Sequence, residues 1–566
     1  MRLLHILFFV LPFIAASAQE TYPKDYFRAP LDIPLLLSGT FGELRSNHFH
    51  SGTDIKTQQR EGLRAFAIGD GYVSRINISP WGYGKALYIT HPNGYTSVYA
   101  HLQKFGPEIE AYVKKQQYEQ ESYSIELFPQ PDELPVKQSD VIAYTGNTGS
   151  SGGPHLHFEI RDTETEKPIN PLFFGLDVKD AQSPVIQELY AYPLSDSSHV
   201  NRSGDPIPVN FRRQPDGTLL ADKIDASGPI GFGVRAYDRQ DLAYNKNGAY
   251  AVQMSVNGTT YLYYDFKTFS FAESRHINTL IDYGHYVRER QRIQKCFISP
   301  GNTLNIYNKR LNEGIIDIRD GMDYTIIIEV SDFEGNTNVL KIPVNGKQQE
   351  ILHKKEIKIT PNYLRTKREN IYAEGKVTVF FPAYTFYEDL YFDLKDNGNG
   401  SYEIHNEEVP VQRNYTLSFD VSDYPETERK QWFIAHLDRR GRPSYETTFK
   451  RGNTFSTHTK RLGTFTLEKD STAPKIIPVN FKDRQWLSNY HYLKVKISDD
   501  LSGIASYRAT INGRWVLMEY EPKDNTLTYD FEDLTLEGSR HDLEISVTDN
   551  VGNSTTFKAT FHRAKK

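Results

Sequence analysis

Sulfur is scarce in this sequence, and so are long apolar segments. Among 566 residues there is one cysteine, Cys296, which excludes a disulfide within the chain and a zinc site built from cysteines. We expect Cys296 to be a buried apolar residue. Beyond the first eighteen residues, no window is long and apolar enough to cross a membrane. The low cysteine content does not exclude a metal site made of histidines and carboxylates.

An excess of positive charge is also absent. The 66 lysines and arginines are outnumbered by 72 aspartates and glutamates, and the net charge of −6 argues against a nucleic-acid-binding protein. With 38 glycines and 29 prolines, the chain is neither collagen-like nor of low complexity. Aromatic residues, at 13%, are abundant and favour β-rich domains, because they pack well on pleated surfaces. The length predicts about three to four domains.

The first eighteen residues have the features of a signal peptide. Arg2 supplies a positive charge, residues 3–15 are apolar, and Ala16-Ser17-Ala18 is a small-residue cleavage site. Gln19 follows, so no cysteine is available there for lipid modification. We expect an exported mature chain without a transmembrane segment, and a cleavable leader fits both the periplasm and the cell exterior. An uncleaved anchor is the alternative.

Two segments of the C-terminal part begin and end alike. The run 180–186 (DAQSPVI) resembles 470–476 (DSTAPKI), and 331–336 (SDFEGN) resembles 548–553 (TDNVGN). Between these, both segments have a Val/Ile-Asn-Gly turn and a strand ending in Tyr-Asp-Phe. A start, a turn and an end that recur in order predict the same β-sandwich unit twice.

The predicted fold is therefore predominantly all-β, with a compact antiparallel β domain followed by about three Ig-like sandwich modules. The expected divisions are the signal peptide at 1–18, an N-terminal lead at 19–34, the Gly-rich and His-rich β domain at 35–175, a sandwich module at 176–348, a divergent β-rich module at 349–468 and a second copy of the sandwich module at 469–566.

The residues suited to chemistry lie in the first of these domains. His50 and Asp54 are four residues apart, His155 and His157 are two apart, and His101 ends a predicted hairpin strand. Side chains at i and i+2 of a strand share a face, so His155 and His157 should point into one cleft, about 6.6 Å apart along the strand. One of them can bind a metal while the other reaches the substrate. Neither pair alone is specific, but their ordered occurrence in one Gly-rich β segment predicts a site.

Zinc suits this set of side chains. A catalytic zinc takes three nitrogen or oxygen ligands and leaves a fourth position open, and imidazole is a favoured ligand. Two further histidines near the metal can accept a proton from water and stabilise the charge of a tetrahedral intermediate. Histidine suits that work because its pKa is ordinarily near neutrality.

Five ordered motifs carry a resemblance to the lysostaphin/LytM-type zinc peptidases, endopeptidases that cut peptide cross-links in bacterial peptidoglycan. The motifs are FGELR (41–45), HSGTD (50–54), YAHL (99–102), GNTG (146–149) and GPHLHFE (153–159).

The resemblance covers roughly 35–175 and implies roles for single residues. It implies that His50, Asp54 and His157 are ligands of one zinc ion and that His101 and His155 are the catalytic pair. It also implies a compact antiparallel β fold with a groove over the metal. Which of the two catalytic histidines is the base stays open.

One departure from the family pattern is an insertion at 107–135. Its first part, from Pro107 to Tyr123, is expected to form a short surface helix. An insertion beside the groove could act as a lid. A surface excursion without a role is favoured, because long inserts cost little stability.

Together these features predict an exported zinc metalloendopeptidase that hydrolyses peptidoglycan stem-peptide cross-links and is positioned by its C-terminal modules, which could have wall or protein ligands. The bond that is cut, a D-Ala–diaminopimelate link or a glycine bridge, stays open. One alternative is a non-catalytic relative that binds the wall or activates another hydrolase. Another is an adhesive or scaffold protein in which the sandwich modules carry the main function, since they make up most of the chain.

Overall fold

The computed structural model describes residues 22–564, and strands predominate among them. The predicted signal peptide at 1–18 lies outside the described residues. The predicted fold class, predominantly β with an antiparallel first domain followed by β modules, is confirmed. No helix in the described part of the chain is long and apolar enough to cross a membrane.

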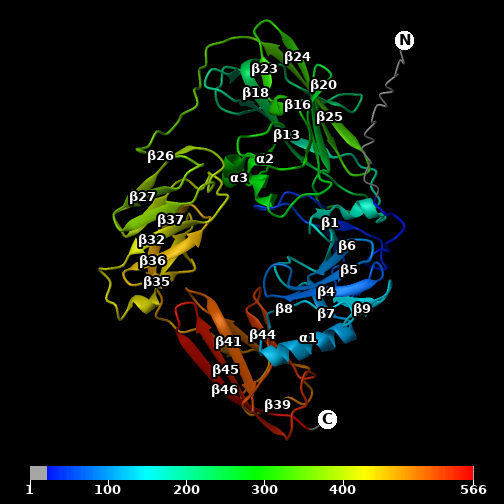
Figure 1. The fold of residues 1–566 in the computed structure, drawn as a ribbon, viewed down its shortest axis with the longest axis vertical. Coiled ribbons are helices and arrows are strands. Elements are labelled where there is room, and N and C mark those ends of the chain that lie inside the picture. Colours follow the sequence, from blue (N-terminus) through cyan, green and yellow to red (C-terminus); the bar gives the residue numbers. More distant parts are fainter. Residues whose placement is uncertain (1–21, 565–566) are drawn as a thin grey trace, which may run out of the picture.

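Four β-rich units follow one another around a ring (Figure 1). Defined by their sheets, they cover 37–174, 185–346, 362–469 and 475–562, and they are called the first to fourth units below. The fourth unit, orange to red in Figure 1, returns to lie against the first, blue to cyan. The domain boundaries predicted from the sequence stay a prediction.

The first unit holds a nine-stranded sheet and a three-stranded sheet. The main path of the larger sheet is β1 (Leu37–Gly39), β2 (Thr53–Lys56), β11 (His155–Asp162), β6 (Tyr95–Ala100), β5 (Lys85–Thr90), β4 (Gly71–Ile78) and β8 (Ile125–Leu127), with β12 (Pro168–Ile169) on β11 and β9 (Pro135–Val136) on β4. The smaller sheet is β3 (Arg64–Phe66), β10 (Val141–Thr145) and β7 (Leu102–Phe105). Residues 91–94 (HPNG), with Asn93 and Gly94 as the turn pair, join β5 to β6 in an antiparallel hairpin in which Thr90 lies opposite Thr96.

The second unit is a thirteen-stranded sheet with short helices at one end. Its strands are β13 (Val185–Pro193), β14 (His199–Val200), β15 (Ile207–Pro208), β16 (Phe211–Arg213), β17 (Leu219–Ala221), β18 (Ile224–Tyr237), β19 (Ala251–Val256), β20 (Thr259–Asp265), β21 (Gln294–Lys295), β22 (Tyr307–Arg310), β23 (Ile316–Ile318), β24 (Asp323–Ser331) and β25 (Thr337–Gly346). The helices of the first two units are α1 (Pro107–Gln120), η1 (Pro171–Phe174), η2 (Ser274–His276), α2 (Ile277–Leu280), α3 (Tyr283–Glu289) and η3 (Asn312–Gly314).

The third and fourth units each contain two facing groups of strands. In the third these are β27 (Asn370–Glu374), β28 (Val377–Phe381), β32 (Tyr415–Asp420), β36 (Thr454–Thr459) and β35 (Phe449–Arg451), then β30 (Leu394–Asp396), β31 (Ser401–Ile404), β37 (Gly463–Lys469), β33 (Trp432–Leu437) and β34 (Pro443–Tyr445), with the pair β26 (Asn362–Leu364) and β29 (Leu390–Phe392) and the helix η4 (Arg429–Gln431). In the fourth they are β38 (Lys475–Pro478), β40 (Tyr492–Ser498), β44 (Thr526–Asp530) and β43 (Glu519–Glu521), then β39 (Gln485–Trp486), β46 (Ser554–His562), β45 (Arg540–Asp549), β41 (Ile504–Ile511) and β42 (Arg514–Trp515).

The sequence repeat corresponds to equivalent strands in the second and fourth units. β13 pairs with β18 as β38 pairs with β40, and the hairpin of β24 and β25 matches that of β45 and β46. The Tyr-Asp-Phe similarity does not extend to the structure. β20 pairs with β19, whereas β44 lies in the other sheet beside β40. The Tyr-Asp-Phe runs at 264–266 and 529–531 therefore occupy different positions in the second and fourth units.

Hydrophobic clusters interlock neighbouring units. Phe41 and Phe49 of the first unit pack in the cluster of the second, against Phe266 and Phe269. Cys296 is fully buried in the same cluster, as predicted. The segment that leads to the predicted metal ligands is thus held between two units.

The fourth unit closes the ring on the first through a partly buried interface. Lys85 is 6% exposed, and its Nζ donates to the Glu519 carboxylate at 2.8 and 2.9 Å and to the Gln103 carbonyl at 3.1 Å. Trp515 and Leu517 of the fourth unit join the hydrophobic cluster of the first. The interface therefore combines apolar burial with an ion pair whose cation is shielded from water.

The insertion at 107–135 supplies much of this interface. Its first part forms α1, which confirms the expected helix. Lys114 on α1 pairs with Asp533, and the rings of Tyr118 and Trp515 meet edge-on with centroids 5.2 Å apart. The interpretation of the insertion as an excursion without a role is wrong, because it docks the fourth unit.

We predict that Glu519→Ala lowers the stability of the closed ring by about 1–3 kcal/mol, because Lys85 keeps its burial and loses its counter-charge. The Glu519 side chain is 42% exposed, so water offsets part of the loss and the effect stays below that of a fully buried pair. The measurement is chemical unfolding of the full chain. Glu544→Ala, which removes a surface pair with Lys558, is the matched control and should change stability by less than about 0.5 kcal/mol. Equal effects of the two variants would contradict the prediction.

Candidate metal centre and active site

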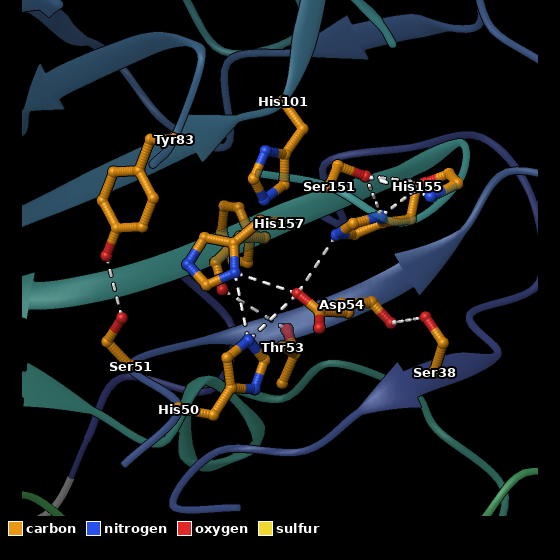
Figure 2. Close-up of polar contacts among 12 residues, drawn as sticks. Ser38, His50, Ser51, Thr53, Asp54, Tyr83, His101, Ser151, His155 and His157 are labelled. Atoms are coloured by element: carbon orange, nitrogen blue, oxygen red, sulfur yellow. Dashed lines mark hydrogen bonds and ion pairs between the residues drawn. The ribbon is translucent and has the colours of Figure 1, made fainter. Parts of the chain in front are cut away.

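Antiparallel pairing of β2 with β11 brings the predicted metal ligands together. The register sets Asp54 opposite His157, and His50 lies in the segment just before β2. The Asp54 Oδ1 atom is 3.0 Å from His50 Nε2 and 2.9 Å from His157 Nδ1, and the two nitrogens are 3.1 Å apart. Figure 2 shows the three side chains converging on one point.

Alternation along β11 explains which side chains face this point. His155, His157, Glu159 and Arg161 occupy every second position and lie on the face that carries the site. The intervening residues, Leu156, Phe158 and Ile160, are buried in the hydrophobic cluster of the first unit. A two-residue period therefore divides the strand into a chemical face and a core face.

Hydrogen bonds orient the rings of His50 and His157, the two histidines predicted to bind the metal, so that one nitrogen of each points inward. His50 Nδ1 donates to the Thr40 carbonyl at 2.8 Å, and His157 Nε2 donates to the Glu159 carboxylate at 2.8 Å. The inner atoms, His50 Nε2 and His157 Nδ1, then lack hydrogens in the neutral rings. With both rings neutral, the three inner atoms of His50, Asp54 and His157 are all lone-pair atoms, an arrangement that a bound cation would satisfy.

The three donor atoms fit zinc. Two imidazole nitrogens and one carboxylate oxygen are a donor set that zinc takes in catalytic sites, with a position left open. Each histidine donates its other N–H to a carbonyl or carboxylate, the outer support that metal-ligating histidines ordinarily have. The three atoms lie within 4.8 Å of one another, close enough to share one ion.

The ionisable groups of the site strongly shift one another's pKa values. Burial alone would lower the pKa of His157, but its contacts with Asp54 and Glu159 outweigh burial and raise the pKa to about 9. Burial opposes ionisation of Asp54, yet the neighbouring His50, His155 and His157 hold its pKa well below the usual range. Both shifts reflect a site that attracts positive charge.

A buried carboxylate lies behind the predicted metal ligands and contacts His157. Glu159 is fully buried, accepts from Ser51 Oγ at 2.7 Å and from Arg161 Nε at 2.6 Å, and also accepts from the Tyr83 hydroxyl. Burial opposes its ionisation, but Arg161 and His157 hold its pKa far below the ordinary value. Glu159 therefore stays charged and fixes the orientation of the His157 ring.

His101 and His155 lie beside the three predicted ligands. Their ring centroids are 4.8 Å apart, and the His101 ring is 5.9 Å from that of His157. His101 Nδ1 donates to the Thr148 carbonyl at 2.9 Å, and His155 Nδ1 donates to the Gly153 carbonyl at 2.8 Å. His101 Nε2 is therefore left with a free lone pair, whereas His155 Nε2 lies 3.5 Å from Asp54 Oδ1.

Burial, together with the neighbouring His157 and His155, lowers the pKa of His101 to about 3, so its ring is neutral. Its φ of +58° lies in the left-handed region, a strained backbone for histidine, at the turn between β6 and β7. The chain thus holds the neutral imidazole of His101 in a fixed direction beside the predicted ligands. All five residues predicted from the sequence come together in one place.

Sequence reasoning did not assign several supporting residues. Tyr83 and Arg161 reach the site through Glu159, and Arg45 Nη2 is 3.2 Å from the outer oxygen of Asp54, Oδ2. The i+2 spacing from His157 could have placed Glu159 on the face of the site. No local pattern marks Tyr83, which comes from a loop 74 residues before His157.

The same segment of the chain matches a known family of proteins. The model of peptidase family M23 matches residues 48–118 and 132–171, and the gap between them falls in the insertion. The first unit is an M23-type domain. The resemblance predicted from the five motifs is therefore confirmed.

Two of the curated proteins similar to this chain are named as endopeptidases. The DD-carboxypeptidase/endopeptidase Mpg of Neisseria meningitidis serogroup B is 32% identical over 133 residues, which are 24% of each chain. The peptidoglycan DD-endopeptidase ShyC of Vibrio cholerae is 30% identical over 145 residues, 24% of this chain and 27% of the relative. This chain thus spans about a quarter of the length of these relatives.

Solved structures are also similar over this part. A zinc-containing peptidase from Vibrio cholerae is 26% identical and covers 28% of this chain and 40% of its own, with a TM-score of 0.20. The catalytic domain of lysostaphin from Staphylococcus simulans is 20% identical and covers 25% of this chain and 93% of its own, with a TM-score of 0.19. In the third unit, residues 361–470 match the model of a Zu5-like domain.

Proposed function

We propose that this chain is an exported zinc metalloendopeptidase that hydrolyses peptide cross-links of bacterial peptidoglycan. The observation that carries the proposal is the meeting of three possible ligand atoms, from His50, Asp54 and His157, beside the imidazole rings of His101 and His155. The curated relatives named above support peptidoglycan as the substrate.

The residues of the chain divide the work as follows. His50 Nε2, Asp54 Oδ1 and His157 Nδ1 would hold the zinc ion, which when bound supplies a Lewis acid to polarise the scissile carbonyl and to activate water. His101 or His155 takes a proton at Nε2 during attack and returns it to the leaving amine. The carbonyls of Thr148 and Gly153, which accept from the two Nδ1–H groups, hold these rings so that Nε2 faces the substrate.

Digestion of purified peptidoglycan sacculi tests the proposal. The mature chain, with and without a zinc chelator, is expected to release fragments whose masses show chelator-sensitive loss of cross-linked dimers. The masses also identify the bond that is cut. Absence of release by zinc-loaded protein would contradict the proposal and return the chain to the non-catalytic, wall-binding alternative, which no feature of the five-residue site favours.

We predict that Glu159→Gln lowers zinc affinity or cleavage by about 10- to 100-fold, because His157 loses the charged acceptor that orients it. The change is nearly isosteric, so the packing around the fully buried side chain is kept. Glu166→Gln is the matched control, since Glu166 also pairs with Arg161, at 3.2 Å, but is 55% exposed and does not contact His157. Zinc titration and sacculus digestion of both variants check the prediction. Equal behaviour of the two would contradict it.

A further inference from the structure

Two groups of three aspartates occupy equivalent places in the second and fourth units. One consists of Asp180, Asp238 and Asp332, and the other of Asp470, Asp499 and Asp549. Within each group, one oxygen from every carboxylate lies within 4.8 Å of the others. In both, the first aspartate precedes the opening strand of the unit, the second follows β18 or β40, and the third ends β45 or follows β24.

In the second unit, an asparagine ties two members of the group together. Asn336 Nδ2 donates to Asp332 Oδ2 at 2.7 Å and to the backbone carbonyl of Asp180 at 3.3 Å. The Asn336 backbone N–H donates to the other oxygen of Asp332 at 2.8 Å. The sequence run 331–336 (SDFEGN) therefore folds into a turn that holds Asp332 close to Asp180.

The fourth unit repeats the same contacts. Asn553 Nδ2 donates to Asp549 Oδ2 at 2.7 Å and to the backbone carbonyl of Asp470 at 3.1 Å, and its N–H donates to Asp549 Oδ1 at 2.8 Å. The two groups agree in partners and distances although the units differ in their remaining strands. The aspartate groups therefore recur together with the repeated strands of the two units.

Two residues at the group of the second unit have buried oxygens without hydrogen-bond partners. Asp238 is 3% exposed and Gln240 is 5% exposed, and neither Asp238 Oδ1 nor Gln240 Oε1 has a hydrogen-bond partner among the described residues. Both residues line, with Asp180 and Asp332, a void of about 20 Å³. That volume holds about one water-sized sphere, which is also the scale of a single ion.

The fourth unit has matching unpartnered oxygens. Asp499 Oδ1 lacks a partner, and so does the hydroxyl of Ser502, a residue only 1% exposed, within the part of the chain that the structure describes. The Ser502 backbone N–H donates to Asp470 Oδ2 at 3.0 Å, which places the residue against the group. In 22–564, no lysine or arginine pairs with any of the six aspartates. Buried negative charge without a counter-charge is costly.

We propose that each group binds one Ca²⁺ ion. The donors are oxygens alone, which suit calcium and magnesium rather than zinc. Calcium accepts several carboxylate and amide oxygens in irregular geometry, whereas magnesium demands near-octahedral geometry and keeps much of its water. A crowded, buried set of protein oxygens therefore favours calcium.

Both sites lie at joints between successive units. The void of the second unit is also lined by Thr40, Phe41 and Asn170 of the first unit. In the fourth unit, the backbone N–H of Asp470 donates to the carbonyl of Gln431 in the third unit at 3.0 Å. An ion at each place links the start of a sandwich to the unit before it, so calcium stiffens two joints of the ring.

Equilibrium dialysis of the full, zinc-loaded chain against ⁴⁵Ca²⁺ tests the proposal. We expect two Ca²⁺ per chain, with dissociation constants of about 10⁻⁴–10⁻³ M, typical of calcium sites in extracellular modules. The double variant Asp238→Asn/Asp332→Asn should bind one, and so should Asp499→Asn/Asp549→Asn. Asp196→Asn, an exposed position outside both groups, should still bind two.

Thermal unfolding supplies a second readout that does not depend on peptidase activity. Calcium should raise the unfolding midpoint of the native chain by several degrees, and each double variant should lose part of that calcium-dependent rise. No binding at about 10 mM Ca²⁺, two ions retained by both double variants, or preferential binding of Mg²⁺ would overturn the proposal.

A third variant keeps the test decisive if a double variant fails to fold. Tyr250 lines the void of the second unit and can sensitise the luminescence of Tb³⁺, a probe that replaces calcium. Tyr250→Phe should lower the calcium-displaceable Tb³⁺ emission and leave the dialysis count at two. Emission that calcium does not displace would overturn the assignment of the site in the second unit.

Discussion

Replacing His157 with alanine is expected to remove both zinc and peptidase activity. The variant loses one of three donor atoms and leaves Glu159 and Asp54 facing an empty space in a buried site. We expect cleavage of sacculi to fall by more than the 10- to 100-fold typical of a supporting residue, since His157 is proposed to contact the metal itself. Metal content by mass spectrometry should drop from about one zinc per chain to a trace.

The control for this variant is His491→Ala, because His491 is 72% exposed and belongs to the fourth unit. It should keep full zinc content and activity. His157→Ala with normal zinc and normal cleavage would refute the ligand assignment. Loss of activity with zinc retained would instead move His157 into the catalytic pair.

Replacing His101 with alanine is expected to abolish catalysis and spare the metal. His101 is proposed to move a proton, and removal of a general acid or base ordinarily costs about 10²- to 10⁴-fold. The zinc content should be unchanged, because no ligand atom belongs to His101. Comparison of zinc content and sacculus cleavage in the same preparation separates this result from that of His157→Ala.

Rescue by added imidazole distinguishes chemistry from structure. The deletion leaves room for a small base next to the Thr148 carbonyl, so imidazole should restore part of the activity of His101→Ala. The same experiment on His155→Ala shows which ring acts as the base. Loss of zinc from His101→Ala would contradict the proposed division between ligands and catalytic pair.

Much of the site could be predicted because its chemistry is local in the sequence. The H-x-x-x-D and H-x-H spacings, set on strands with a period of two, indicate which side chains share a face. Glu159 follows from the same alternation but was not assigned, since an acidic residue in a strand has many ordinary roles. The repeats predicted two similar units, whose strand pairs and aspartate groups agree.

The closure of the ring could not be predicted. Lys85 and Glu519 are 434 residues apart, and nothing in either segment signals a partner. Trp515 has the appearance of an ordinary strand residue, although it packs in the core of the first unit. Contacts between units that are far apart in the sequence depend on the shapes of the folded surfaces. No short sequence pattern reveals those shapes. For the same reason, the insertion was given no role.

Because the four units form a closed ring, each unit is held by non-covalent contacts as well as by the polypeptide chain. Residues 347–361 connect the second unit to the third, and the segment contains no strand or helix and is largely exposed. A single cut there would open the polypeptide, yet both pieces would stay associated through the Lys85–Glu519 interface and through contacts such as Arg275 with the Val411 carbonyl. A protease acting on this connection would therefore produce a nicked but intact assembly, with the candidate peptidase site still flanked by the same neighbours.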